Sequence, residues 1–244
     1  MELQFLGSGD AFGSGGRFNT CFYVRDRQGA FLVDCGASSM VAIRKFGIDP
    51  NTIRAVLITH LHGDHFGGLP FFILDAQLVS RRTAPLTIAG PPGLHDRLMA
   101  AMENFFPGST KVERRFAVDV RELETRVAHD IDGIAITPYV VKHACGAPPF
   151  ALRLTVDGKV LCYSGDTEWA EGLREAAQGA DVFLVEAYFY DKQVKFHLDF
   201  ATLAQHLPGL GAKRVILTHM SADMLARAGE TGCEVADDGM IISV

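Results

Sequence analysis

Three histidines and one aspartate lie within six residues of the segment THLHGDHFGG. Neutral imidazole and carboxylate are the ligands that zinc and related divalent metals prefer. His60 and His62 are two positions apart after a strand-like run, so their side chains can point the same way. Asp64 and His65 follow a glycine, where we expect the chain to turn tightly. Four ligands from so short a loop do not fit around one ion, and the pattern therefore indicates two ions side by side.

Further ligands are expected where other strand-like runs end. The run KVLCYSG leads into Asp166, RVILT into His219, and YVVK into His143. A carboxylate can bridge two ions, and an open position for water is typical of a catalytic rather than a structural site. The predicted ligand set is His60, His62 and His143 for one ion, Asp64, His65 and His219 for the other, and Asp166 shared by both.

The elements that must position these residues alternate along the chain. Ten strand-like runs are rich in Val, Ile, Leu and Phe and are bounded by Gly, Asp or Pro. The early runs follow one another as in hairpins, and the later ones alternate with helices, which indicates packed sheets with helices outside. Helices are expected at residues 38–46, 67–79, 92–104, 170–178 and 199–207.

The motif HLHGDH resembles the signature of the metallo-β-lactamase superfamily. The resemblance continues through FLGSGDAF, LVDCG, KHACGAPPFALRL, YSGDT, LTH and ADDGM, and so spans nearly the whole chain. It implies a four-layer αββα sandwich as a single domain over residues 1–244, with the metal site at the edge of the sheets. Asp34 in LVDCG is expected to accept a hydrogen bond near the site, because metal-bound histidines need a partner for their other nitrogen.

The segment VEAYFYDKQVKFHLDFATLAQHL resembles the part of the tRNase Z branch that carries a Glu–His pair. The resemblance implies that His197, held by Glu186, protonates the leaving oxygen of a phosphodiester. In the mechanism that we expect, Asp64 accepts a proton from the attacking water. The match departs from the branch in the residues HLD, where a small hydroxyl residue usually follows the histidine. A structural alternative is that His197 merely precedes a helix that Asp199 caps.

The long basic arm with which tRNase Z enzymes grip tRNA is missing between His143 and Asp166. Only 23 positions separate these two residues, and the formal net charge of −6 argues against a nucleic-acid surface. We therefore predict a metal-dependent hydrolase of a small or short phosphodiester, in which a hydroxide formed between the two ions attacks phosphorus. The alternatives are a thioester or lactone hydrolase with the same ions, a tRNA 3′-processing endonuclease, and a metal-binding module without catalysis.

Composition adds few further constraints. Hydrophobic residues make up 48% of the 244 residues, enough for a sizeable core, and no apolar run is long enough to cross a membrane. The five cysteines form no CxxC pair, and no basic leader opens the sequence, so a reducing, cytoplasmic location is expected. Zinc is the expected metal, with manganese or iron as alternatives, and a homodimer is an open expectation from the superfamily.

One glycine-rich segment, GSGDAFGSGGRFN, does not have the spacing of a nucleotide phosphate-binding loop. Its place in the sequence instead predicts a loop that lines the rim of the metal site, where glycine permits close approach of the backbone.

Overall fold

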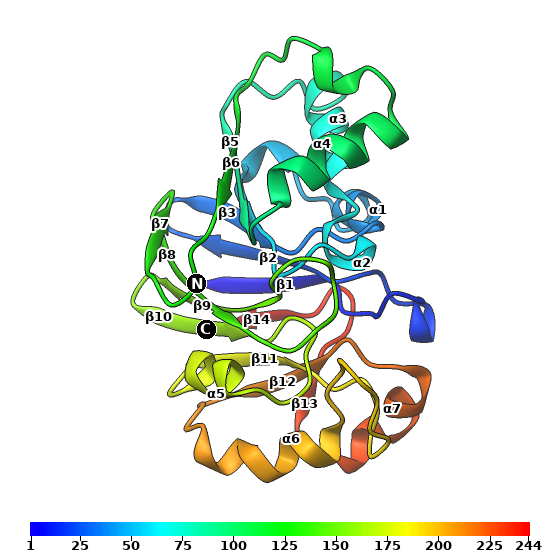
Figure 1. Ribbon diagram of the computed structural model, residues 1–244, viewed down its shortest axis with the longest axis vertical. Coiled ribbons are helices and arrows are strands. Elements are labelled where there is room, and N and C mark those ends of the chain that lie inside the picture. The colour runs from blue at the N-terminus through cyan, green and yellow to red at the C-terminus, as the bar shows by residue number, and fades with distance from the viewer.

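The computed structural model describes residues 1–244, and its strands form two sheets of seven strands each (Figure 1). The first sheet has the order β14-β1-β2-β3-β4-β5-β6, and the second has the order β13-β12-β11-β10-β9-β8-β7. The strands are β1 (Glu2–Gly7), β2 (Cys21–Asp26), β3 (Gly29–Val33), β4 (Ile53–Leu57), β5 (Leu86–Gly90), β6 (Val118–Glu122), β7 (His129–Ile131), β8 (Ile134–Val140), β9 (Phe150–Val156), β10 (Lys159–Tyr163), β11 (Val182–Glu186), β12 (Val215–Thr218), β13 (Glu234–Val235) and β14 (Ile241–Ser243).

Helices cover the outer face of each sheet. The α-helices are α1 (Ser39–Lys45), α2 (Gly63–Phe66), α3 (Leu69–Leu78), α4 (Leu94–Phe105), α5 (Glu171–Ala177), α6 (Phe200–His206) and α7 (Ala222–Arg227). Short 3₁₀ helices are η1 (Ser14–Gly16), η2 (Pro50–Thr52), η3 (Ser109–Lys111), η4 (Leu207–Gly209) and η5 (Ala228–Glu230). In Figure 1, α1 to α4 lie beyond the first sheet and α5 to α7 beyond the second. None of the helices combines the length and the apolar composition that a membrane span requires.

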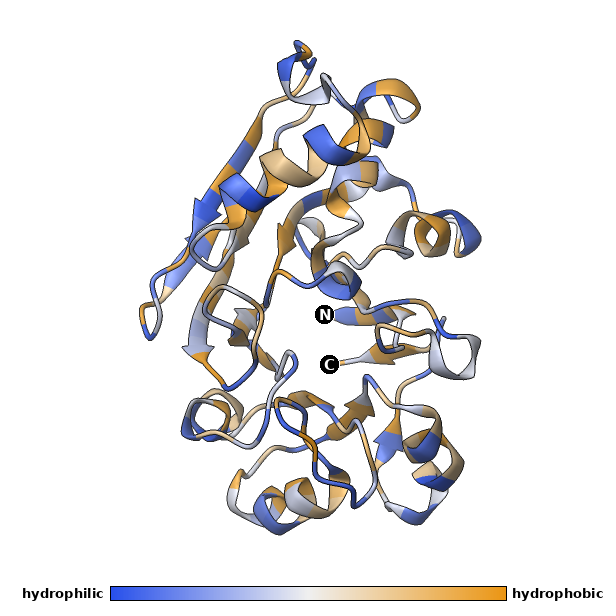
Figure 2. Cartoon of the chain, turned by 45° about the vertical axis from the view of Figure 1, so that its right-hand side comes forward, coloured by the Kyte–Doolittle hydropathy of each residue, from blue (hydrophilic) through white to orange (hydrophobic).

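Apolar side chains form three buried layers between these elements. Between the sheets, Phe5 and Phe22 of the first sheet meet Phe150 and Tyr163 of the second, with the rings of Phe22 and Tyr163 4.9 Å apart. Two further clusters fill the spaces under the two groups of helices. Hydrophobic positions accordingly recur along the strands in Figure 2. Two sheets between two helical layers confirm the predicted αββα sandwich.

Strand direction brings the predicted site residues to one edge of the sandwich. Strands β3 to β6 run parallel to one another, and so do β10 to β13. In the second parallel set, Glu186 at the end of β11 pairs with Thr218 at the end of β12. Because the carboxyl ends of parallel strands meet at the same edge, the loops that follow them come together.

Two sequence-based expectations differ from the structure. The glycine before Asp64, Gly63, does not form a tight turn with a positive φ; it begins the short helix α2, whose first turn carries Asp64 and His65. Strands β6, β7, β13 and β14 were not predicted from sequence. All four lie at the edges of the sheets, and β7, β13 and β14 have only two or three residues. In β6 the exposed polar residues alternate only with Val118 and Val120.

Candidate metal centre

Seven side chains from the predicted ligand set meet at the edge of the sandwich. His60, His62 and His143 place one ligand atom each within 4.8 Å of one another. Asp64, His65, Asp166 and His219 form a second group under the same limit. Loops after β4, β8, β10 and β12, together with the first turn of α2, carry them. The six residues other than Asp166 divide between the two groups as predicted from sequence. Asp166 falls in the second group, and it also belongs to a third one, which consists of Asp166, Glu186, His197 and His219.

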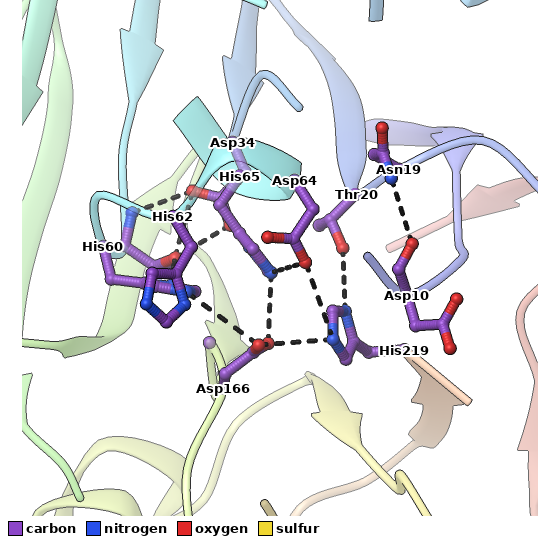
Figure 3. Close-up of polar contacts among 12 residues, drawn as sticks. Asp10, Asn19, Thr20, Asp34, His60, His62, Asp64, His65, Asp166 and His219 are labelled. Atoms are coloured by element: carbon purple, nitrogen blue, oxygen red, sulfur yellow. Dashed lines mark hydrogen bonds and ion pairs between the residues drawn. The ribbon is translucent and has the colours of Figure 1, made fainter. Parts of the chain in front are cut away.

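Asp166 is the carboxylate that lies between the two groups. Its Oδ1 is 3.1 Å from His65 Nε2, and its Oδ2 is 3.2 Å from His219 Nε2. The same Oδ2 lies 3.9 Å from His60 Nε2 and 4.0 Å from His143 Nε2. Figure 3 shows the rings of His65 and His219 directed at this carboxylate. One oxygen of Asp166 therefore faces both histidine groups.

Several polar atoms of this cluster lack a hydrogen-bond partner, and their chemistry suits divalent cations. His60 Nε2, His65 Nε2 and Asp166 Oδ1 are buried and make no hydrogen bond, although the last two lie 3.1 Å apart as an ion pair. His62 Nδ1 and His143 Nε2 face each other at 3.0 Å. Buried polar atoms are normally paired, so a convergent set of unpaired ones indicates a missing partner. Imidazole nitrogen and carboxylate oxygen are the donor atoms that zinc and similar metals take.

The outward-facing nitrogens of four histidines each have a protein partner. His65 Nδ1 lies 2.6 Å from Asp34 Oδ2, as predicted, and His60 Nδ1 lies 3.0 Å from Thr59 Oγ1. His143 Nδ1 donates to the carbonyl of Phe196 at 2.8 Å, and His219 Nδ1 lies 3.3 Å from Thr20 Oγ1. Such contacts fix which ring nitrogen points inward and how the ring is oriented. The structure therefore holds the inward nitrogens ready for ligation.

Burial and charge set the protonation of the cluster. Burial lowers the pKa of His60 well below its ordinary value, so this imidazole is neutral, as a metal ligand must be. Burial also opposes charge on His65, but the carboxylates of Asp166 and Asp64 outweigh it and raise the pKa of His65. Burial alone would raise the pKa of Asp166, whereas the surrounding histidines hold it well below its ordinary range. Carboxylates in this arrangement attract positive charge, which a divalent cation supplies in place of protons.

Asp34 gives a direct test of these outer contacts. Its carboxylate accepts from Thr59 N at 2.8 Å and from the His65 ring, and it is fully buried. We expect Asp34→Asn to weaken divalent-metal binding by about 10- to 100-fold, because the neutral amide no longer supports the His65 ring as a negative acceptor does. Competition with a chromophoric chelator measures this change. Asp75→Asn, at an aspartate that pairs with Arg44 on the surface, is the matched control and should leave metal affinity unchanged. Equal affinity in both variants would contradict the assignment.

Three residues beside the site adopt left-handed backbone conformations without being glycine. The φ angles are 57° at Asp34, 71° at Phe196 and 56° at His219. Such conformations cost about 1–3 kcal/mol each and persist where the surrounding structure imposes them, often at functional sites. Gly36 is required by close approach, since a Cβ there would lie 2.1 Å from the Asp64 carbonyl oxygen. The backbone is thus constrained around the metal-ligand candidates.

Glu186 and His197 form a hydrogen-bonded pair next to the histidine cluster. His197 Nδ1 contacts Glu186 Oε1, and Glu186 Oε2 accepts from the backbone N–H of Thr167 at 2.8 Å and of Leu198 at 3.3 Å. With both oxygens engaged, Glu186 has little capacity left to ligate an ion. The ion-pair partner of Glu186 is His197, and Glu186 pairs with no lysine or arginine. Asp199 caps α6 by accepting from Thr202 N, as predicted.

The pair keeps its proton on the imidazole. Burial lowers the pKa of His197, but the hydrogen bond and the charge of Glu186 outweigh burial and raise it to about 9. Burial and the neighbouring negative charge of Asp166 raise the pKa of Glu186, while the hydrogen bond from His197 opposes this rise. His197 Nε2, which faces away from Glu186, is then a protonated donor on the wall of the site.

Hydrogen bonds through Glu168, which no sequence pattern predicts, link the segments that carry His143 and His197. Glu168 accepts from the backbone N–H of Phe196 at 2.8 Å and from Lys142 Nζ at 2.6 Å. The carbonyl of the same Phe196 orients His143, and His197 is the next residue. No periodicity or motif marks Glu168, because the contact bridges loops that are 28 positions apart. It ties the segments carrying His143 and His197 together.

The cluster opens into a pocket of about 200 Å³. The metal-ligand candidates on its floor are His62, Asp64, His143, Asp166 and His219, and the remaining lining residues are Ala11, Phe12, Tyr188 and His197. Ala11 and Phe12 belong to the glycine-rich segment, which therefore lines the rim as predicted. Pockets for drug-sized ligands span about 300–1,000 Å³, so this one suits a small substrate group.

An αββα sandwich with this histidine and aspartate cluster at its edge defines a hydrolase of the metallo-β-lactamase fold, related to RNase Z and to phosphodiesterases. The predicted likeness to the tRNase Z branch is confirmed. More particularly, the family described as Anti-Pycsar protein Apyc1 matches residues 1–236, and the chain belongs to this family.

Individual relatives agree with this placement. Ribonuclease Z of Methanothermobacter thermautotrophicus is 28% identical over 301 aligned positions, which cover 100% of this chain and 97% of that protein. The structure of human tRNase Z, short form (ELAC1), superposes with a TM-score of 0.82 at 27% identity, covering 100% of this chain and 99% of that one. A diphosphatase from the PhnP family shares the fold, with a TM-score of 0.79 at 19% identity and coverage of 100% and 97%.

Proposed function

We propose that this protein hydrolyses a small or short phosphodiester at a centre of two divalent metal ions, with zinc as the first candidate. His60, His62 and His143 would hold one ion, and Asp64, His65 and His219 the other, with Asp166 between them. When bound, two such ions lower the pKa of a coordinated water and stabilise charge that develops on the phosphoryl oxygens. The unpaired inward-facing atoms of the cluster support this assignment.

The observation that favours a phosphodiester is the Glu186–His197 pair on the pocket wall. A departing alkoxide is a poor leaving group and benefits from a proton donor in the transition state. His197 holds that proton at Nε2, and Glu186 positions the ring through Nδ1. Asp64, which lines the same pocket, would accept a proton from the attacking water. A thioester expels a thiolate, which departs without such a donor, and it therefore ranks second. A lactone also expels an alkoxide, so the activity panel must separate it from a phosphodiester.

A short substrate is favoured over tRNA by the chain between His143 and Asp166. A turn and the strands β9 and β10 occupy this interval, and no arm projects from it. The RNase Z likeness nevertheless makes precursor tRNA a necessary arm of the test.

An activity panel on zinc-loaded protein tests the proposal. We expect turnover of bis-p-nitrophenyl phosphate and little or none of a thioester, a lactone or a precursor tRNA. Metal content measured on the same sample should be two equivalents per chain. Cleavage of an ester without phosphodiester turnover would overturn the proposal, and tRNA cleavage at its 3′ side would select the endonuclease alternative.

The pH dependence of Glu186→Gln tests how His197 is held. A general acid must be protonated, so the rate should fall as pH rises through the pKa of His197, about 9. Glutamine keeps an acceptor oxygen but removes the negative charge that raises this pKa. We expect the alkaline limb of kcat/KM for an alkyl phosphodiester to move to lower pH by about one unit or more. An unmoved limb would show that another group controls it.

A further inference from the structure

Phe196 lies in a two-residue turn directly before His197, and its backbone conformation is unusual for an aromatic residue. Val194 and His197 form an isolated antiparallel bridge, so Lys195 and Phe196 are the two central residues of the turn. Phe196 has a φ of 71°. A turn with a positive φ at its second central residue normally has glycine or asparagine there. Contacts from outside the turn must therefore hold phenylalanine in this conformation.

Both polar groups of the Phe196 backbone are bound by residues of the candidate metal centre and its surroundings. The N–H donates to Glu168 Oε1 at 2.8 Å, and the carbonyl accepts from His143 Nδ1 at 2.8 Å. The turn has little packing of its own, since residues 191–193, 195 and 196 are exposed and Val194 is only partly buried. Segments with few buried apolar contacts open easily unless specific contacts hold them. The position of the turn therefore depends on Glu168 and His143.

Glu168 is fixed to two segments that carry metal-ligand candidates. It lies two positions after Asp166 in the sequence. Its N–H donates to the carbonyl of Lys142 at 3.1 Å, its Oε2 accepts from Lys142 Nζ at 2.6 Å, and Lys142 directly precedes His143. The lysine side chain is 61% exposed, so this ion pair contributes little by itself. The hydrogen bond to Phe196 is what ties the turn to both ligand segments.

We infer that Glu168 is a positioning residue that couples metal binding to the placement of the proton donor. Ligation through His143 Nε2 favours the ring orientation in which Nδ1 donates to Phe196, and so favours the turn that presents His197. A turn that Glu168 holds in place favours ligation in return, because a coupling free energy acts equally in both directions. This inference rests on the proposed function and names a further residue that positions its groups.

Zinc affinity and hydrogen exchange of the full chain test the coupling without turnover. Competition with a chromophoric chelator measures the affinity, and mass spectrometry of peptides covering residues 189–199 measures exchange in metal-free and zinc-loaded protein. In wild type, zinc should slow exchange of this segment about tenfold or more. Glu168→Ala should lower the zinc affinity about tenfold and lose most of this slowing. Glu168→Gln should keep most of both, since its amide oxygen still accepts from the Phe196 N–H.

Glu175→Ala is the matched control. The Glu175 side chain is 29% exposed, against 25% for Glu168, and it pairs with Arg126. Neither Glu175 nor Arg126 is among the residues that line the catalytic pocket. The control removes a similar surface ion pair and should change zinc affinity and exchange by no more than about twofold.

A kinetic readout distinguishes positioning of His197 from a general loss of stability. At saturating zinc, Glu168→Ala should lose more kcat/KM on an alkyl phosphodiester than on bis-p-nitrophenyl phosphate, by about threefold or more, because only the alkoxide needs the proton donor. Equal losses on the two substrates would overturn the role of Glu168 in placing His197.

The remaining outcomes separate this inference from the proposed function. Wild-type zinc affinity in Glu168→Ala, or zinc-dependent slowing that survives in that variant, would overturn the coupling. Equal damage by glutamine and alanine would overturn it as well, because it would show that the hydrogen bond to Phe196 does not hold the turn. Absence of phosphodiester turnover in wild type, together with zinc affinity and exchange that depend on Glu168, would reject the proposed function and support the coupling.

Discussion

Protein carrying Asp166→Asn should bind fewer than two metal equivalents and lose about a thousandfold of its phosphodiesterase activity. Asp166 is the carboxylate whose oxygens face His60, His65, His143 and His219 within 4.0 Å. Asparagine has the same shape, but it is neutral and replaces one acceptor oxygen with a donor. A shared anionic ligand is thereby lost, and the charge stabilisation of two ions, worth several kcal/mol in the transition state, is lost with it.

Elemental analysis after dialysis against trace zinc measures the metal content, and bis-p-nitrophenyl phosphate measures the activity. Asp26→Asn is the matched control. Asp26 is an aspartate of equal burial, with a side chain 3% exposed, but it pairs with Arg54 on the far side of the fold from the cluster. We expect this control to be less stable to heat while it retains two metal equivalents. Two tightly bound ions and full activity in Asp166→Asn would remove the basis of the proposed centre.

The positions of His60, Asp166 and His219 were predictable because each follows a strongly apolar strand. The last three residues before each of His60, Asp166 and His219 are buried in the structure, and parallel pairing brings the strand ends to one edge. The end of an apolar run thus predicts where a loop begins, and a polar residue just after that end is a candidate for the functional site. Short, polar strands at the sheet edges carry no comparable signal, which is why β6 and β7 were missed.

Sequence patterns do not predict contacts between loops. Glu186 and His197 are 11 positions apart, and only the resemblance to the tRNase Z branch suggested that they pair. The carboxylate of Asp238 accepts from the backbone N–H groups of Ser8 and Phe18, which are 230 and 220 positions away in the sequence. The left-handed conformation of Phe196 depends on contacts made after folding, and no local propensity of phenylalanine predicts it. These features arise from tertiary packing and need coordinates.

Replacing His197 with alanine should lower kcat/KM by a factor that depends on the leaving group of the substrate. For a phosphodiester with an alkoxide leaving group, we expect kcat/KM to fall by about 10²–10⁴-fold, because His197 supplies the proton that the departing oxygen needs. For bis-p-nitrophenyl phosphate the loss should be smaller by at least about tenfold, since p-nitrophenolate departs without protonation. The diagnostic quantity is the ratio of the two losses.

His206→Ala is the matched control for this experiment. His206 lies at the end of α6, stacked on Trp169 at 3.8 Å, and it is not among the residues that line the catalytic pocket. Its replacement removes an imidazole of the same region and should change neither rate by more than about twofold. Metal content of both variants should remain two equivalents, because Glu186 and His197 are placed outside the ligand set.

Equal losses on both substrates would give His197 a different role. A fall in metal content in His197→Ala would then point to the third group of converging side chains, Asp166, Glu186, His197 and His219, as a ligand set. Unchanged metal content with equal losses would indicate substrate positioning, which raises KM more than it lowers kcat. Only a loss that grows as the leaving group becomes more basic identifies the imidazole as the proton donor, because no effect on binding or on metal affinity depends on the basicity of the departing oxygen in this way.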